Sequence, residues 1–260
     1  MAYLTFKELG RYGRLGNQLF QIAGTIGLAL RHQMEPRFPT NWDYREWFSI
    51  PDELFADAEG VTAYYMPELD HLRPENRPFL QQFSLWEGQA DLIRQYFAPS
   101  PAASKALATD ELDDQPRVAL HVRRGDYLLA PEAHPVPPLE YYLNAVAEYP
   151  HHVIEVYSDD LEWCWNNLLP ALEPRPAFLY PGTARPPFWD PAYFTSPIVD
   201  WIDLFLMARC ERHIIANSSF SWWGAFLSGN TEVIYPATWY GPAYSHLDVD
   251  AMMPPGWRSR

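Results

Sequence analysis

An apolar strand runs directly into two adjacent arginines and a glycine in the stretch Arg117-Val118-Ala119-Leu120-His121-Val122-Arg123-Arg124-Gly125-Asp126-Tyr127. Its apolar residues recur with a period of two, which predicts a buried strand. The glycine permits the sharp turn that follows. Ligands of open α/β sheets bind beyond the carboxyl ends of the strands. We therefore expect four polar side chains to converge on one site: His121, Arg123, Arg124 and Asp126.

The arginine pair indicates an anion with several oxygens. Each guanidinium offers a planar fork of donors and stays charged at any working pH, which suits a phosphate or diphosphate. A second interpretation pairs Arg124 with Asp126 at the surface and lets the stem of Arg123 cover apolar surface. The stretch alone leaves both open. The tripeptide Arg124-Gly125-Asp126 also occurs in cell-attachment loops, but it is common by chance and here adjoins a buried strand.

Composition limits the classes of function. The 260 residues can hold one large domain or two small lobes, and 48% hydrophobic residues indicate a globular chain. The net charge of −14 argues against binding to nucleic acid or to anionic membranes. Two cysteines without ligand-type spacing predict neither a disulfide framework nor a zinc site. We find no cleavable signal and no apolar run near the ~20 residues that span a bilayer, so we expect a cytoplasmic protein, with peripheral membrane association left open.

The N-terminal part should form its own lobe. A strand near residues 3–6 is followed by a glycine-spaced loop and an amphipathic helix to about Arg31. Asn17 and Gln18 lie where the loop meets this helix, as caps or as substrate contacts. A strand at residues 79–86 and a helix near residues 89–97 complete the lobe. The polar, proline-flanked segment 99–116 then marks a boundary, giving domains 1–115 and 116–260.

Strands and helices alternate after this boundary. The pattern predicts helices at 139–148, 161–169, 198–212 and 221–227, and strands at 152–157, 213–216 and 232–235. Such alternation indicates a parallel sheet covered on both faces. The second domain should therefore be Rossmann-like.

A second polar cluster lies where a short strand meets a helix, at Asn217, Ser218 and Ser219. Hydroxyls and free backbone N–H groups at the positive end of a helix suit phosphate oxygens. The alternative is an ordinary N-cap. Several small polar residues exceed the needs of one cap, so we expect Ser218 and Ser219 to contact a ligand. Trp222 and Trp223 should pack in the core.

Three pairs of carboxylates are further candidates. Asp200 and Asp203 share one face of a helix, where a carboxylate would suit the N1 and N2 donors of guanine, or both face solvent. Asp159 and Asp160 follow a strand and fit either a ribose or metal site or a loop cap. Asp248-Val249-Asp250 matches the metal-binding pair of metal-dependent glycosyltransferases, but it does not end a mid-chain strand, so we discount it.

Together these motifs resemble the α1,2-fucosyltransferases of glycosyltransferase family 11. The similar stretches, in family order, are Gly13 to Gln21, His121 to Tyr127, Tyr157 to Asp160 with Trp163-Cys164, and Asn217 to Ala225. The element His-x-Arg-Arg-x-Asp is also similar to that of α1,6-fucosyltransferases and protein O-fucosyltransferases. The resemblance implies GDP-fucose as donor, an oligosaccharide acceptor, and a GT-B architecture of two facing Rossmann-like lobes.

The resemblance also implies roles for individual residues. Arg123 would bind the donor diphosphate, His121 and Asp203 the guanosine, and Ser218 and Ser219 the phosphates. We add Arg124, Asn217 and Asp159 on the donor side, and Asn17 and Gln18 on the acceptor side. Arg123 and Asp126 are the expected catalytic residues, with Asp126 either a base or the partner that orients Arg124.

The expected reaction is inverting and uses no metal and no cofactor. A preorganised arginine can stabilise the charge that develops on the β-phosphate as the fucose C1–O bond breaks. Two alternatives remain: a non-catalytic carbohydrate-binding or adhesion module, and a transferase for another nucleotide-sugar. Two departures from the family pattern, Arg14 for a glycine and Ile22 for a tyrosine, lie in the lobe expected to hold the acceptor.

Overall fold

The computed structural model describes residues 2–56, 61–62, 79–107, 115–173, 176–179 and 199–260. The chain divides into two compact units. The first comprises Met1–Ala106 with Asp250–Met253, and the second comprises Leu107–Val249 with Pro254–Arg260. The boundary expected between residues 115 and 116 adjoins residues 108–114, which lie outside the described residues. Each unit is described separately below.

The first unit is built on a three-stranded parallel sheet of order β2-β1-β3, with β1 at Tyr3–Thr5, β2 at Glu35–Arg37 and β3 at Val61–Thr62. Helix α1 (Leu15–Arg31) is buried over nearly its whole length because apolar or small residues occupy most of its faces. Two shorter helices follow, α2 (Ala90–Tyr96) and α3 (Pro101–Leu107). The α1 and α2 helices agree with the sequence prediction.

The strand predicted at residues 79–86 is wrong. Leu80 has a positive φ of 54°, which ends extended backbone, and the Gln82 N–H donates to the Leu80 carbonyl oxygen at 2.8 Å. Residues Phe83–Leu85 then form a 3₁₀ turn. The apolar side chains from Leu80 to Trp86 are nevertheless buried, although the backbone that carries them forms turns and not a strand.

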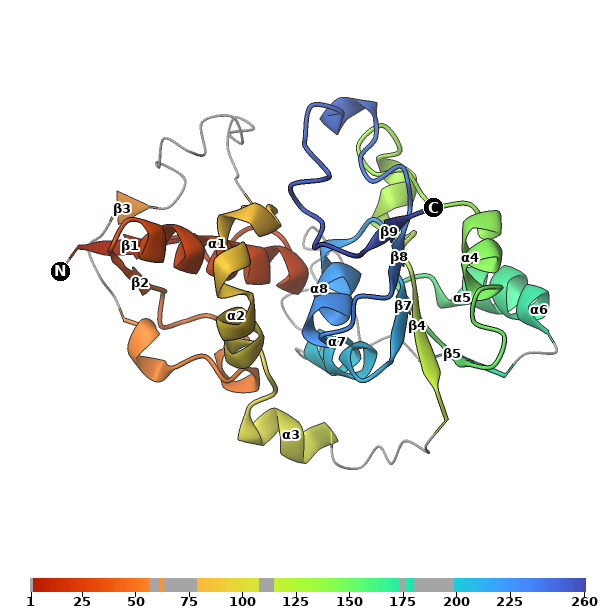
Figure 1. The fold of residues 1–260 in the computed structure, drawn as a ribbon, viewed down its shortest axis with the longest axis horizontal. Coiled ribbons are helices and arrows are strands. Elements are labelled where there is room, and N and C mark those ends of the chain that lie inside the picture. Colours follow the sequence, from red (N-terminus) through yellow and green to blue (C-terminus); the bar gives the residue numbers. More distant parts are fainter. Residues whose placement is uncertain (1, 57–60, 63–78, 108–114, 174–175, 180–198) are drawn as a thin grey trace. The chain divides into compact units, whose positions relative to one another are not determined.

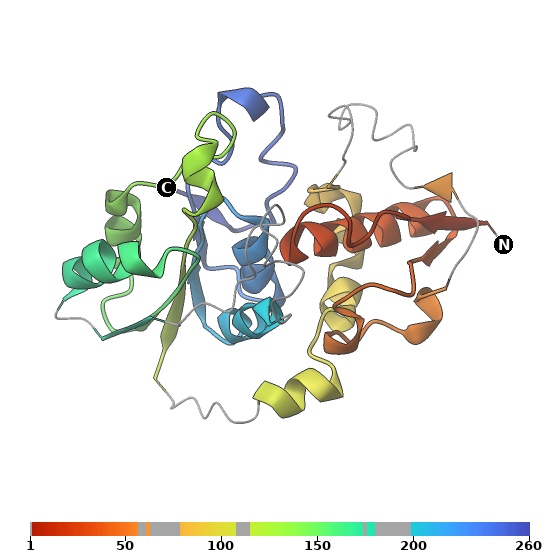
Figure 2. The same ribbon diagram turned by 180° about the vertical axis from the view of Figure 1, so that it is seen from behind.

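The second unit contains a six-stranded parallel sheet of order β6-β5-β4-β7-β8-β9. Its strands are β4 (Arg117–Val122), β5 (Val153–Ser158), β6 (Ala177–Leu179), β7 (Arg212–Ile214), β8 (Val233–Tyr235) and β9 (Arg258–Ser259). Helices α4 (Leu139–Val146), α5 (Leu161–Trp163) and α6 (Leu169–Leu172) lie on one face, and α7 (Asp200–Ala208) and α8 (Ser219–Leu227) lie on the other (Figures 1 and 2). This confirms the expected parallel sheet covered on both faces.

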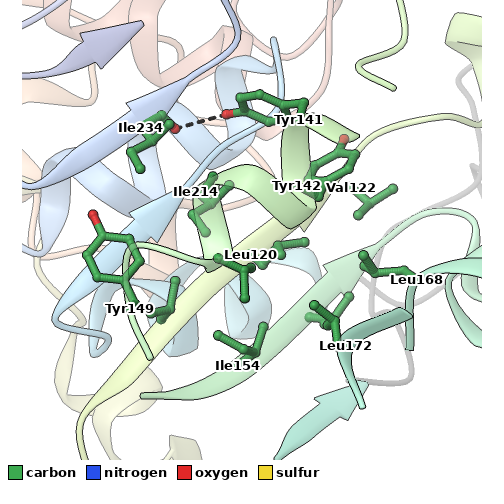
Figure 3. Packing of buried hydrophobic residues seen from close by; sticks show 14 of the residues in the cluster. Leu120, Val122, Tyr141, Tyr142, Tyr149, Ile154, Leu168, Leu172, Ile214 and Ile234 are labelled. Carbon is green, nitrogen blue, oxygen red and sulfur yellow. Dashed lines mark hydrogen bonds between the residues drawn. The ribbon is translucent and has the colours of Figure 1, made fainter. Parts of the chain in front are cut away.

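One face of β4 and β5 is apolar. Figure 3 shows Leu120 and Val122 of β4 and Ile154 of β5 among the side chains of α4 and of the segment that ends in α6. The hydroxyl of Tyr141 lies 2.7 Å from the Ile215 carbonyl oxygen and 3.1 Å from that of Ile234. Helix α4 is thereby anchored to the sheet by a buried polar contact as well as by packing.

The opposite face of these strands is buried but polar. Arg117 forms an ion pair with Glu155, and the Tyr157 hydroxyl donates to the same carboxylate at 2.7 Å. On β7, the His213 ring nitrogen Nε2 donates to the Met207 carbonyl oxygen of α7 at 2.8 Å. Because strand side chains alternate, His121 and Arg123 continue this polar row toward the carboxyl end of β4.

Within the described part of the chain, no helix has both the length and the apolar character needed to cross a membrane.

Candidate active site

Arg123 and Asp159 directly follow two neighbouring strands, β4 and β5. Strands β4 and β5 are parallel and pair Val122 with Ser158, so the residues that follow meet at the carboxyl edge. The Arg123 atom Nη1 forms an ion pair with Oδ2 of Asp159, and Nη2 forms one with Oδ1 of Asp126. The interpretation that paired Arg124 with Asp126 is therefore wrong, because Arg123 takes that partner.

Arg123 is a buried cation. Its side chain is 7% exposed, and its guanidinium carbon lies 5.0 Å from the ring centroid of Tyr127. Burial acts to lower the pKa of Arg123, but Asp159 and Asp126 outweigh it and raise the pKa above its ordinary value. The guanidinium is thus permanently charged and fixed at the end of β4.

Arg124 has a different set of contacts. Its Nε donates to Oδ2 of Asp160 at 3.0 Å, and its guanidinium carbon lies 4.3 Å from the ring centroid of Trp163. Its backbone N–H donates to Oδ1 of Asp159 at 2.9 Å. Asp160 also caps α5, since its Oδ1 accepts from the Trp163 N–H at 3.0 Å. The cap interpretation is confirmed for Asp160.

His121 is buried and neutral. Burial lowers the pKa of His121 to about 4, against an opposing contribution from Asp159. Its Nδ1 makes no hydrogen bond to the described residues, and its ring centroid lies 5.8 Å from that of Phe220 in the first turn of α8. The neutral ring therefore keeps one buried polar atom beside the start of that helix.

The start of α8 brings three predicted residues together. Ser218 is the N-cap, and its hydroxyl accepts from the Phe220 N–H at 3.3 Å; Ser219 is the first helical residue. The Asn217 side-chain N–H groups donate to the carbonyl oxygens of Pro135 at 2.8 Å and Trp239 at 3.0 Å. Its Oδ1 is buried without a hydrogen bond to the described residues.

The loop after β7 is joined to the loop after β4. The Tyr127 hydroxyl donates to the Asn217 carbonyl oxygen at 3.0 Å, and the Tyr127 ring stacks on that of His134, with 4.5 Å between the ring centroids. The buried rings of Trp222 and Trp223 lie further along α8, as expected. Tyr127 was missed as a supporting residue, although an aromatic four residues after Arg123 was a visible signal.

Asp200 and Asp203 lie in the first turn of α7 and are 5% and 6% exposed. The solvated-surface interpretation is therefore wrong for both, because each carboxylate is buried. By contrast, Asp248 and Asp250 are exposed. Among the described residues, no group of three or more His, Cys, Asp or Glu side chains is placed to hold a metal ion.

Asn17 and Gln18 belong to α1 of the first unit. The Gln18 amide donates to the Gly13 carbonyl oxygen at 3.0 Å and accepts from the Trp42 indole N–H at 2.8 Å. The Asn17 Oδ1 accepts from the Gln81 amide at 2.6 Å. Neither residue caps the helix, whose N-cap is Arg14, so the cap interpretation is wrong. Both side chains tie the start of α1 to neighbouring loops.

Comparison with known proteins places the chain in a family. The family model described as Glycosyl transferase family 11 matches residues 91–259. The chain belongs to glycosyl transferase family 11. This confirms the family that the motifs indicated.

Relatives of this family 11 chain come from bacteria and mammals. The O-antigen biosynthesis glycosyltransferase WbnK of Escherichia coli is 34% identical over 51% of this chain and 42% of its own length. The α-1,2-colitosyltransferase of Escherichia coli is 32% identical over 57% and 50%. The galactoside α-(1,2)-fucosyltransferase 1 of Sus scrofa is 28% identical over 72% and 44%. The chain thus spans about half the length of the curated relatives that it matches.

Two solved structures share the fold. POFUT1 in complex with GDP has a TM-score of 0.50 at 13% identity, covering 90% of this chain and 98% of that one. A mutant of Arabidopsis thaliana FUT1 in complex with GDP has a TM-score of 0.54 at 10% identity, covering 90% and 70%. At these identities the likeness concerns the fold alone, and it confirms the expected α/β fold of GT-B type for this family 11 chain.

Proposed function

We propose that this chain is an inverting, metal-independent fucosyltransferase that moves L-fucose from GDP-fucose to a galactoside hydroxyl, in α1,2 linkage. The observation that carries the proposal is the charged, buried Arg123 fixed at the carboxyl end of β4 in a family 11 chain. Relatives named as an α-1,2-colitosyltransferase and as galactoside α-(1,2)-fucosyltransferases support the linkage. Two structures of the same fold hold GDP, which supports the nucleotide.

The leaving group explains why an arginine is needed. Cleavage of the bond between fucose C1 and oxygen leaves negative charge on the β-phosphate of GDP. Arg123 stabilises this charge without reorganising, because two carboxylates already fix its guanidinium. The N-terminus of α8, with Ser218 and Ser219, supplies N–H and hydroxyl donors to the phosphate oxygens. We assign Arg124, which is held by Asp160 and Trp163, as a second cation on the donor side.

The nucleoside is assigned to buried polar groups of the second unit. A neutral His121 offers one donor and one acceptor. The buried carboxylate of Asp203 suits the two adjacent donors of guanine. Asn217 contributes its Oδ1 as an acceptor, because its Nδ2 already donates to two carbonyl oxygens. These three groups would select guanine over bases that lack paired donors.

The acceptor hydroxyl loses its proton as it attacks. Asp126 is our candidate for the proton acceptor, since its carboxylate lies beside Arg123 and its side chain is 21% exposed. Asn17 and Gln18 would act on the acceptor side by shaping the loop that contains Gly13, to which the Gln18 amide donates. No cofactor enters this scheme, and we expect the reaction to take place in the cytoplasm.

Nucleotide binding tests the proposal and separates it from its alternatives. Calorimetry with GDP, UDP and ADP in the presence of EDTA should show selective binding of GDP. Binding of another nucleotide would indicate a different donor, and binding of none would favour a carbohydrate-binding module. Transfer from labelled GDP-fucose to a panel of galactosides then tests the sugar and the linkage.

A donor that carries colitose is a second candidate. The observation that favours it is the identity to the α-1,2-colitosyltransferase, 32%, against 28% to the pig fucosyltransferase. Competition between GDP-linked fucose and GDP-linked colitose, measured as the ratio of their kcat/KM values, decides between the two sugars.

A further inference from the structure

We propose that Asp159 is a positioning residue that holds the guanidinium of Arg123 in place, and is not a ligand of the donor. The inference rests on the proposed function, because it concerns how the catalytic arginine of that reaction is held. It also replaces our expectation that Asp159 binds the donor directly.

Both carboxylate oxygens of Asp159 are engaged with the loop after β4. Oδ2 pairs with Nη1 of Arg123, and Oδ1 accepts from the backbone N–H of Arg124 at 2.9 Å. The carboxylate therefore connects one arginine's side chain to the next residue's main chain. A guanidinium fixed relative to its own backbone loses the freedom to rotate away from the carboxyl end of β4.

Gly125 makes this approach possible. A Cβ added at Gly125 would lie 2.5 Å from Oδ2 of Asp159, closer than carbon and oxygen can approach without displacement. A side chain at position 125 would therefore displace the Asp159 carboxylate, which follows a different strand. Two motifs far apart in the sequence act as one unit because β4 and β5 are neighbours in the sheet.

Asp160 provides a matched comparison. It is the next residue along the chain and is also paired with an arginine, but with Arg124, and it caps α5. Its side chain is 25% exposed, against 13% for Asp159. A change at Asp160 removes a neighbouring negative charge and leaves the contacts of Arg123 with Asp126 and Asp159 intact.

We call the two contacts of the Asp159 carboxylate, with the Arg123 guanidinium and the Arg124 N–H, the Asp159 clamp. Loss of this clamp should affect turnover more than the binding of GDP. A mobile Arg123 can still meet the charge of GDP, but it no longer stands where negative charge develops in the transition state. For Asp159→Asn we expect kcat to fall by about 10²-fold, with the Kd for GDP changed by less than about threefold. Asp160→Asn, which removes a contact of Arg124 and none of Arg123, should leave the side-chain order of Arg123 as in the parent. The kinetic control is Asp91→Asn, whose side chain is fully exposed and pairs with Arg94 in the first unit; it should change both values by less than about threefold.

The experiment measures steady-state kinetics with GDP-fucose and calorimetry with GDP for Asp159→Asn and Asp91→Asn, and repeats them in an Arg123→Lys background. If Asp159 acts through Arg123, Asp159→Asn costs little more in that background, because the two changes remove the same effect. Three results would overturn the inference. The first is a loss of GDP affinity in Asp159→Asn as large as its loss of kcat, and the second is normal turnover by that variant. The third is a double variant whose loss of kcat equals the product of the losses in Asp159→Asn and Arg123→Lys.

Side-chain order of Arg123 gives a readout that does not depend on activity. Nitrogen relaxation of its Nε by NMR should report a rigid side chain in the parent protein and a mobile one in Asp159→Asn. If Asp159→Asn fails to fold, Gly125→Ala takes its place in the experiment. This variant keeps the charge of Asp159 but pushes its carboxylate away, so the Arg123 side chain should again be mobile. A side chain equally ordered in the parent and the variant refutes the clamp, whereas a parent that binds no GDP refutes the proposed function.

Discussion

The stability of this protein should fall between pH 7 and pH 5 because His213 is buried and neutral. Its Nε2 donates to the Met207 carbonyl oxygen, so the second proton of a charged ring would have to sit on Nδ1, which meets no acceptor among the described residues. Burial therefore lowers the pKa of His213 to about 4, with Arg212 adding to the effect. The unfolded chain binds that proton at a pKa near 6.5.

The magnitude follows from these two pKa values. Well above pH 6.5 the ring is neutral in both the folded and the unfolded state, so it does not make the free energy of unfolding depend on pH. Below pH 6.5 the unfolded state binds a proton that the folded state does not bind, so the free energy of unfolding decreases. Between pH 7 and pH 5 the free energy of unfolding should decrease by about 2 kcal/mol on account of His213. His121, whose pKa is also lowered to about 4, should contribute a similar amount.

Urea unfolding at several pH values measures the effect. His213→Gln keeps an amide donor for the Met207 carbonyl and removes the titration, so its free energy of unfolding should fall by about 2 kcal/mol less than that of the parent over this range. His151→Gln, at an exposed position, should follow the parent. Parallel curves for the parent and His213→Gln would show that the buried ring is not the source of the pH dependence.

Three further outcomes are expected. Gly241→Ala should lower the free energy of unfolding by about 1–3 kcal/mol, because its Cβ would lie 2.4 Å from the Glu132 carbonyl oxygen; Gly88→Ala, with open space around it, is the control, and equal stabilities would contradict the prediction. Trp42→Phe should cost about 1–3 kcal/mol by leaving Oε1 of the buried Gln18 without its indole donor, 2.8 Å away; denaturation that matches the parent would speak against it. Turnover should persist in EDTA at the parent rate, and restoration of a lost rate by a divalent cation would show that a metal takes part.

Local patterns were sufficient to predict the central strands. The alternation of Val118, Leu120 and Val122 placed β4, and the apolar residues after His152 placed β5. The same alternation did not reveal that the opposite face carries Glu155 and a row of buried polar groups. Such a face is stabilised by partners from other elements, and no local pattern contains them.

The segment at residues 79–86 shows the limit of hydrophobic spacing. Its apolar residues from Leu80 to Trp86 are buried, but the positive φ of Leu80 directs the chain into turns. A leucine gives no sign of that backbone conformation, unlike a glycine or asparagine. The cap interpretation of Asn17 and Gln18 failed for a related reason, because their partners Gln81 and Trp42 are distant in the sequence.

The positions of the polar residues near Arg123 in the fold were predicted better than the partners with which they pair. The position of Arg123 at the end of β4 followed from the strand and turn alone. Its pairing with Asp159 depends on β4 lying next to β5 in the sheet. The sequence of neither strand predicts this order. The sequence left open a pairing of Asp126 with Arg124, because both arginines are within reach of that carboxylate along the chain.

The most direct test of the account is transfer of fucose by variants of Arg123. Arg123→Lys keeps the positive charge beside Asp126 and Asp159 but removes the fork, and Arg123→Ala removes both; Arg212→Ala is a control, since that arginine pairs with Glu232 at 3.1 Å at the start of β7. We predict that kcat with GDP-fucose falls by about 10²–10³-fold or more in Arg123→Ala, with an intermediate loss in Arg123→Lys and no loss in the control. Near-normal turnover by a folded Arg123→Ala protein would contradict the claim that this guanidinium stabilises the departing nucleotide.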